Sequence, residues 1–306
     1  MKLFALLLIA PLTAGERQQF SRELMGTTFS ITCYTDDPAL AKKAAAEAFA
    51  AAAAINAVAS DYLTDSELSK LSSAPVDEPI ELSATLFDLL ETARRTAQMT
   101  GGLYDPTLGP LTRLWRESRR TGCLPDSETL AAARKATGWQ HYALDSEART
   151  ITLGKPGMRF DLGGLAKGYA ADQMLAILVE QGIQRSSVVA GGDIAVAAAP
   201  SGRGAWRVGL KTFDPRKPDE AVPLVHAAVS TSGDLFQFVD IDGVRYSHIL
   251  DPATGLGLTD PIAVSVIAPK ATLSDPLATA ACVAGADKAK ELLKSWGATD
   301  FRVRTR

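Results

Sequence analysis

What this sequence lacks excludes several common functional classes. Its net charge is −3 and it has no long basic run, so it offers no electrostatic surface for nucleic acid, and we expect no nucleic-acid partner. It has only three histidines, and no two of them have the spacing of a zinc site. The cysteines, Cys33, Cys123 and Cys282, lie far apart, so at most one disulfide can form, and a chain of this length needs none.

Familiar nucleotide-binding and nucleophile motifs are also missing. The glycine spacings differ from those of a dinucleotide fingerprint or a Walker loop. No Gly-x-Ser-x-Gly elbow occurs and nothing around the cysteines supports a nucleophile, so covalent catalysis is not indicated. With 46% hydrophobic and 22% charged residues, the chain has the composition of a globular protein that buries a large core.

The first 15 residues have the pattern of a compact secretory signal. Lys2 precedes an apolar run and then small residues, with cleavage expected after Ala14 or Gly15, and the run is too short to span a bilayer. A buried N-terminal strand is the alternative. No lipoprotein cysteine follows, so we expect a periplasmic protein without a lipid anchor. No linker or repeat divides residues 16–306, which we expect to form a single domain.

The hydrophobic pattern predicts an α+β fold, with a mostly antiparallel sheet and packed helices, because hairpin signals outnumber regular β-α alternation. Asp242-Gly243 is a strong signal for a tight hairpin turn. Helices are expected near residues 37–60, 83–101, 126–138, 165–178, 274–284 and 287–296. Strands are expected near residues 25–34, 142, 151, 158–162, 187–196, 206–213, 227–231, 235–241, 244–249, 261–268 and 301–305.

The stretch 160–172 organises the chain. Paired glycines, Gly163 and Gly164, follow an expected strand and precede an expected helix, and glycine lets a backbone approach a ligand closely. The helix N-terminus and Lys167 favour an anion, whereas Asp161 would repel one unless a metal or a donor from the ligand lies between. Phosphate with a metal, or phosphate with a hydrogen-bonding base, reconciles these features. A glycine turn needed only for helix packing is the alternative.

Two further segments carry candidate chemistry. Asp275 and Thr279 stand one helical turn apart, so both oxygens can face one point, and an oxygen-only set suits Mg²⁺. An ordinary helix N-terminus is the alternative for this pair. His248 lies between Ser247 and an Asp-Pro turn, where it can act as a general base near neutral pH or as a structural histidine.

Taken in order, eight segments resemble the signatures of the ApbE family, the FAD:protein FMN transferases. The resemblance runs from about residue 21 to 296. Its segments are Met25-Gly26-Thr27, Asp65-Ser66-Glu67-Leu68, Tyr104-Asp105-Pro106-Thr107, residues 161–172, Gly191-Gly192-Asp193, Ser232-Gly233-Asp234, residues 247–255 and residues 275–279.

The resemblance implies an ApbE-like (T-fold-like) architecture and an extracytoplasmic, Mg²⁺-dependent enzyme that uses FAD as its substrate. Such an enzyme attaches FMN through a phosphoester to a Thr or Ser hydroxyl of a target protein and releases AMP. The implied partners are FAD and target flavoprotein subunits, with peripheral association to inner-membrane redox complexes. A Mg²⁺-dependent FAD pyrophosphatase and a flavin-binding protein without turnover are the alternatives.

Position by position, the resemblance also implies roles for single residues. His248 matches the proposed base. The implied metal site is made of Gly164, through its carbonyl, Asp275, Thr279 and Thr272. The implied FAD contacts are Met25, Tyr62, Leu103, Tyr104, Asp105, Asp161, Lys167 and Ile249. An aromatic residue at position 62 resembles the transferases of the family rather than the relatives that chiefly hydrolyse FAD.

Overall fold

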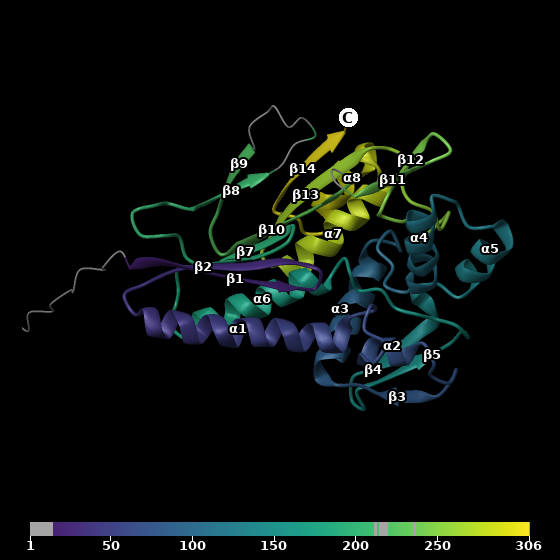
Figure 1. Cartoon of the computed structure of the whole chain (residues 1–306), viewed down its shortest axis with the longest axis horizontal. Helices are drawn as coiled ribbons and strands as arrows, with labels where there is room; N and C mark the ends of the chain where they lie inside the picture. The colour runs from purple at the N-terminus through teal and green to yellow at the C-terminus, as the bar shows by residue number, and fades with distance from the viewer. Residues whose placement is uncertain (1–14, 211–212, 214–219, 235–236, 306) are drawn as a thin grey trace, which may run out of the picture.

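A seven-stranded antiparallel sheet forms the centre of the computed structural model (Figure 1). The structure describes residues 15–305 apart from 211–212, 214–219 and 235–236, so the predicted signal segment lies outside the described residues except for its last residue, Gly15. In spatial order the strands are β1 (Glu16–Leu24), β2 (Thr27–Thr35), β6 (Ser186–Ala190), β7 (Asp193–Val196), β10 (Ala227–Gly233), β13 (Ile262–Ala268) and β14 (Asp300–Thr305).

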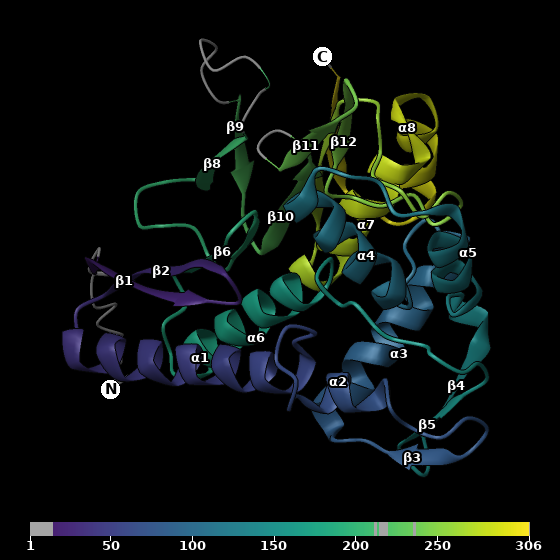
Figure 2. The same cartoon turned by 45° about the vertical axis from the view of Figure 1, so that its right-hand side comes forward.

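Four helices pack along this sheet. They are α1 (Pro38–Ala59), α6 (Ala166–Glu180), α7 (Ala271–Ala284) and α8 (Ala286–Ser295). In Figures 1 and 2, α1 and α6 run side by side below the β1–β2 end, and α7 lies beside β10. Alanines on the buried face of α1 allow this close approach, because a small side chain keeps the two helix axes near each other. The helices and strands share one large hydrophobic core.

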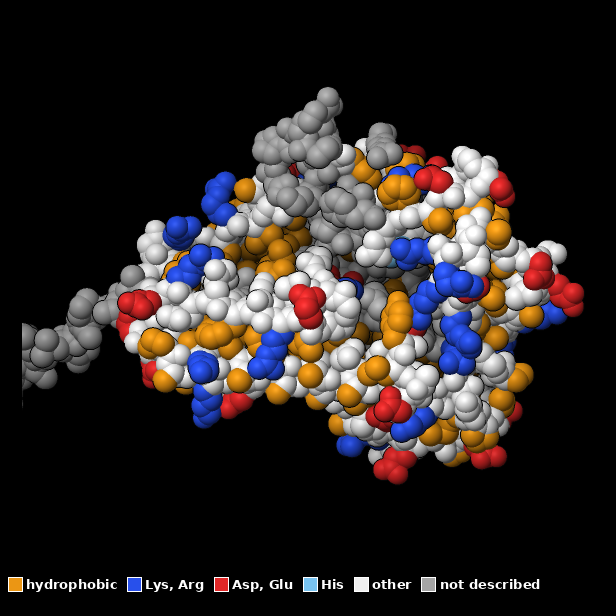
Figure 3. All heavy atoms as spheres, viewed as in Figure 1, with side chains coloured by type: hydrophobic (Ala, Val, Ile, Leu, Met, Phe, Trp, Pro, Cys, Tyr) orange, Lys and Arg blue, Asp and Glu red, His pale blue; other side chains and the backbone are white. Residues whose placement is uncertain are grey.

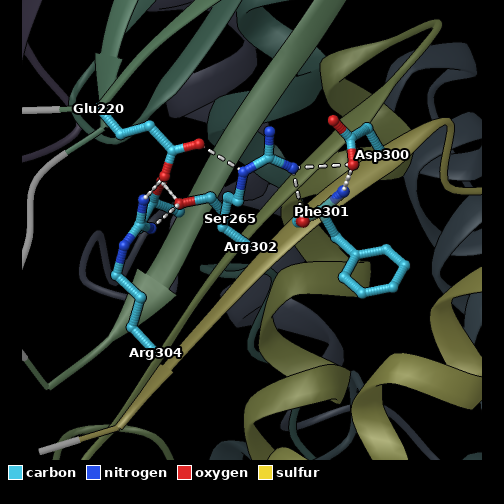
Figure 4. A network of polar contacts seen from close by, with 7 residues as sticks. Glu220, Ser265, Asp300, Phe301, Arg302 and Arg304 are labelled. Carbon is cyan, nitrogen blue, oxygen red and sulfur yellow. Dashed lines mark hydrogen bonds and ion pairs between the residues drawn. The ribbon is translucent and has the colours of Figure 1, made fainter.

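The other face of the sheet is partly covered by a ribbon of β8 (Trp206–Leu210) and β9 (Glu220–Leu224). Ion pairs hold this ribbon to the sheet edge: Glu220 contacts Arg302 at 2.5 Å and Arg304 at 2.8 Å, both on β14 (Figure 4). Glu220 is half exposed to solvent, so each ion pair adds little to the free energy of unfolding. The network mainly fixes the position of the ribbon.

A second group of elements lies beyond the ends of α1 and α6 (Figure 2). It contains α2 (Glu67–Leu71), α3 (Ala84–Met99), α4 (Gly109–Thr121), α5 (Ser127–Lys135), the 3₁₀ helix η1 (Trp139–His141) and a small sheet of β3 (Pro79–Glu81), β5 (Thr150–Leu153) and β4 (Tyr142–Asp145). A ribbon of β11 (Phe238–Ile241) and β12 (Val244–Ser247) packs against α4 of this group. The α+β class with antiparallel pairing is therefore confirmed.

Three sequence expectations about strands are wrong. Residues 187–196 form two strands, because Gly191-Gly192 turns the chain between β6 and β7. Met25 belongs to no strand: with Gly26 it forms the β1–β2 turn, with φ of 48° and 72°. Residues 158–162 form no strand, although Arg159 makes an isolated bridge with Leu108.

Other differences concern the ends of elements. Helix α7 begins at Ala271, so Asp275 lies in its second turn rather than at its start, and Pro276 lies inside the helix. β12 ends at Ser247, which leaves His248 just outside the strand. The expected strands 206–213 and 235–241 extend into positions outside the described residues. None of the described helices is long and apolar enough to cross a membrane.

Candidate active site

The turn before α6 has its own hydrogen-bond pattern. The Asp161 carboxylate accepts a hydrogen bond from the Gly163 N–H at 2.8 Å, which bends the chain into the turn. One helical turn later, Lys167 Nζ donates to the Gly163 carbonyl at 2.7 Å. The ammonium is thereby drawn back over the N-terminus of α6, where its charge adds to the positive end of the helix dipole.

Two buried carboxylates approach this ammonium from other elements. Lys167 Nζ lies 3.6 Å from Asp193 Oδ2 on β7 and 3.8 Å from Asp275 Oδ2 on α7. Burial, together with the charge of Asp193, raises the pKa of Asp275 to about 7, although Lys167 and the Gly168 N–H oppose the shift. Burial lowers the pKa of Lys167, but the carboxylates outweigh it and the pKa is raised. One ammonium thus faces two carboxylates in a poorly solvated place.

Neutral oxygens complete the corner. A Cβ on Gly164 would lie 3.1 Å from Thr279 Oγ1 and 3.6 Å from the Tyr104 ring, so these three residues are neighbours. Ser232 Oγ lies 3.0 Å from Thr279 Oγ1. The Tyr104 hydroxyl is buried and has no hydrogen-bond partner among the described residues. Such a group costs free energy unless a ligand or water satisfies it.

Helix α7 is fixed to α6 by two carboxylates. Asp275 accepts a hydrogen bond from the Gly168 N–H at 3.2 Å, at the N-terminus of α6. In return Asp172 on α6 accepts the Ala271 and Thr272 N–H groups at 2.9 and 2.8 Å, at the N-terminus of α7. Each helix thus caps the other. The register of α7 against α6 is set by these bonds.

Thr272 is placed differently from the other predicted metal ligands. Its hydroxyl donates to Asp172 Oδ2 at 2.6 Å. It lines a surface cavity of about 270 Å³ together with Tyr169 and Lys270, a cavity that neither Asp275 nor Thr279 lines. The structure therefore brings Gly164, Asp275 and Thr279 together and gives Thr272 a capping partner.

His248 follows β12 directly. Its Nδ1 lies 3.2 Å from the Gln237 carbonyl, which can only accept, so Nδ1 carries the proton and Nε2 is the acceptor in the neutral ring. Burial lowers the pKa of the imidazole, and the charges of Arg119 and Lys167 act in the same direction, while the Gln237 carbonyl opposes them. The Trp115 Nε1–H holds the preceding carbonyl, that of Ser247, at 3.1 Å.

The predicted flavin contacts differ in their burial and in their hydrogen bonds. Tyr62 is 74% exposed, and Leu103 and Met25 are half-buried at the edge of the main core. Ile249 is buried. The Asp105 carboxylate accepts hydrogen bonds from Thr107 N at 2.8 Å, from Thr107 Oγ1 at 2.6 Å and from Trp139 N at 3.2 Å. Asp105 therefore organises its own loop.

Two residues at the site were not predicted to belong to it. Asp193 stands in the Gly191-Gly192-Asp193 segment, which resembles a family signature, but no role was predicted for Asp193 itself. Arg116 had no signal, because it is one of several arginines on an amphipathic helix. In the structure its guanidinium reaches Asp61 at 2.6 Å and Asp161 at 3.7 Å.

Comparisons with known proteins show to which family the chain belongs. A model of the ApbE family matches residues 25–301. The chain is 32% identical to the FAD:protein FMN transferase of Treponema pallidum (strain Nichols), over 92% of this chain and 83% of the relative. It is also 32% identical to the FAD:protein FMN transferase of Vibrio cholerae (serotype O1, strain O395), over 90% of this chain and 83% of the relative.

Solved structures of ApbE proteins have the same fold as this chain. The apo flavinyl transferase ApbE of Pseudomonas stutzeri superposes with a TM-score of 0.85 at 28% identity, covering 95% of this chain and 92% of that one. The ApbE protein of Thermotoga maritima superposes with a TM-score of 0.84 at 29% identity, covering 95% and 97%. The predicted ApbE-like architecture is confirmed, and the chain belongs to the ApbE family.

Proposed function

We propose that this protein is an FAD:protein FMN transferase that moves FMN from FAD to a Thr or Ser hydroxyl of a target protein and releases AMP. Family membership and the names of its relatives support flavin transfer. The observation that carries the proposal is the convergence of Lys167, Asp275, Thr279 and Gly164 at one corner. Charge neutralisation of a diphosphate needs such a corner.

The residues present fit a divalent cation of the Mg²⁺ type. If Asp193 and Asp275 are both ionised, their charge exceeds that of the single ammonium, and the neutral oxygens are those that Mg²⁺ accepts. No cluster of three or more His, Cys, Asp or Glu side chains occurs in the described part of the chain, so a soft-metal site is not built there. We infer that Asp275, Thr279 and the Gly164 carbonyl hold Mg²⁺, which when bound neutralises charge on the diphosphate.

The chain's own residues account for the rest of the reaction. The acceptor hydroxyl attacks the flavin-side phosphorus, the new P–O ester bond forms and the bond to the AMP oxygen breaks. The acceptor proton passes to His248 Nε2, the ring nitrogen left without a proton by the Gln237 contact. The lowered pKa of His248 keeps the imidazole neutral near pH 7, as a base must be. Lys167 offers positive charge to the phosphates.

The test is incubation of the purified protein with FAD, Mg²⁺ and a candidate target domain. We expect covalent flavin fluorescence on the target in a denaturing gel. Free FMN alone would identify a pyrophosphatase, and unchanged FAD a flavin-binding protein without turnover. His248→Ala should abolish transfer and leave the FAD dissociation constant within about twofold, because the imidazole acts on the acceptor proton. His141→Ala, an exposed histidine on η1, is the matched control and should transfer normally.

We further propose that the protein works in the periplasm, on flavoprotein subunits associated with inner-membrane redox complexes. The signal-like pattern of residues 1–15 supports the location, and the family supports the kind of partner. Cell fractionation checks the location. Co-expression with candidate targets, scored for protein-bound flavin fluorescence that depends on this chain, checks the partner.

A further inference from the structure

Arg116, in the middle of α4, contacts three side chains that come from two other segments. Its Nη2 lies 2.6 Å from Asp61 Oδ2 and 3.7 Å from Asp161 Oδ2. Its Cζ lies 3.8 Å from the centre of the Tyr62 ring. Asp61 and Tyr62 follow α1, whereas Asp161 begins the turn before α6. The Arg116 side chain thus joins these two segments.

We propose that Arg116 is a positioning residue for FAD, which holds Asp161 and Tyr62 in the arrangement that binds the nucleotide. The inference deepens the proposed function and rests on it. Arg116 itself need not touch the reacting atoms.

The first argument is the orientation of Asp161. One carboxylate oxygen, Oδ1, accepts the Gly163 N–H, so the second, Oδ2, is the one that turns toward Arg116. Two contacts from different segments fix the rotation of the carboxylate, which stands directly before the paired glycines. A planar guanidinium can serve two carboxylates at once, which an ammonium does less well.

The second argument is charge. Asp61 and Asp161 each expose 17% of the side chain and share the guanidinium of Arg116. Burial and the charge of Asp161 raise the pKa of Asp61, and Arg116 opposes that shift. Without Arg116, two carboxylates would repel each other with little solvent between them, and the segments that carry them would separate.

The third argument is the Tyr62 ring. A ring that is 74% exposed has few contacts to hold it, and Arg116 covers one of its faces. The opposite face is then the one offered to a planar flavin. Fixing the ring before binding removes an entropy cost that a free side chain would pay on ordering.

The helix that carries Arg116 is itself anchored beside the base. Trp115 donates to the Ser247 carbonyl and packs with Leu111, Ile241 and Leu250 in a separate hydrophobic cluster. Figure 3 shows Lys and Arg side chains gathered in the area of α4, so Arg116 stands out by its contacts and not by its charge. Helix α4 therefore links the predicted flavin contacts to His248.

The experiment compares Arg116→Gln and Arg116→Lys with Arg120→Gln, a control on the same helix whose exposed side chain pairs with Glu117. FAD dissociation constants come from quenching of flavin fluorescence, and transfer kinetics come from the gel assay. We expect Arg116→Gln to weaken FAD binding about tenfold, with Arg116→Lys between it and the unaltered protein. The KM for FAD should rise with it, while kcat changes less than about twofold.

A double variant separates positioning from direct contact. In a Tyr62→Leu background, Arg116→Gln should weaken FAD binding by a smaller factor. In that background Arg116 can position only Asp161, because the Tyr62 ring is already absent. Equal factors in both backgrounds, or normal FAD binding by Arg116→Gln alone, would overturn the inference. Failure of the unaltered protein to transfer flavin would overturn the proposed function instead, since the binding measurement does not depend on turnover.

Discussion

A methyl group at Gly168 would push apart the two helices that build the metal corner. Its Cβ would lie 2.4 Å from the Ala271 carbonyl oxygen and 2.9 Å from Asp275 Cβ. Both atoms belong to α7, and the first is backbone, which cannot rotate away. An ordinary contact distance is about 3.5 Å, so α7 must retreat by roughly 1 Å to admit the methyl group.

Two opposing effects set the stability of Gly168→Ala. Alanine in place of glycine inside a helix is worth about 1 kcal/mol by propensity alone. Overpacking a close helix contact costs about 1–3 kcal/mol. The free energy of unfolding should therefore fall by only about 1 kcal/mol, because the propensity gain offsets part of the clash.

The functional loss should be much larger than the stability loss. Metal-ligand distances tolerate shifts of about 0.2 Å, and a retreat of α7 by about 1 Å moves Asp275 and Thr279 away from Gly164 together. A displacement of that size typically costs about 100-fold in rate. We therefore expect folded Gly168→Ala protein with little flavin transfer, even at high Mg²⁺.

The assay is flavin transfer across a Mg²⁺ titration, with urea unfolding of the same samples. Gly204→Ala is the matched control, because its added Cβ would meet no atom within 4 Å and its φ lies outside the left-handed region. Normal transfer by Gly168→Ala, at the usual Mg²⁺ concentration, would show that the approach of α6 to α7 does not set the site.

Two other predictions concern the same corner. Burial and the charge of Asp193 raise the pKa of Asp275 from 3.8 to about 7. Between about pH 4 and 7, Asp275 is therefore protonated in the folded protein and ionised in the unfolded chain. Metal-free stability should therefore decrease as pH rises through this window, and Mg²⁺ should raise the melting temperature more at about pH 8 than at about pH 6; equal shifts would contradict this reasoning. Asp172→Ala and Asp126→Ala both remove a helix cap, at a cost of about 1 kcal/mol each. Only Asp172→Ala should lower Mg²⁺ affinity and transfer, and equal activity of the two variants would refute the capping argument.

Most helices were predictable because their ends are marked by local chemistry. Asp37, Ser83 and Asp126 cap α1, α3 and α5, and they stand where the sequence predicted these helices to begin. Strand β1 was missed because residues 16–24 are mostly polar and exposed, as an edge strand can be, so they show no buried face. The Gly191-Gly192 turn was read as the interior of one strand because apolar residues continue on both sides.

The site was predictable only where one segment carried its own signal. A window of a few residues is enough to recognise the paired glycines with Lys167, and the same holds for the Asp275–Thr279 spacing. Asp193 and Arg116 cannot be recognised in this way, since their importance comes from partners that are far away in the sequence. Asp193 meets Lys167 through the pairing of β7 in the sheet, and Arg116 meets Asp161 through the packing of α4.

The reciprocal caps explain why these signals lie where they do. Asp275 cannot cap α6 unless α7 comes close, which requires a glycine at position 168, and Asp172 can reach the α7 N-terminus only from the next turn of the same helix. The two helices therefore specify each other's register through backbone N–H groups. Because Gly164 and Lys167 stand at the start of one helix and Asp275 and Thr279 on the other, the geometry of the corner follows from helix packing and does not depend on a loop closing over it.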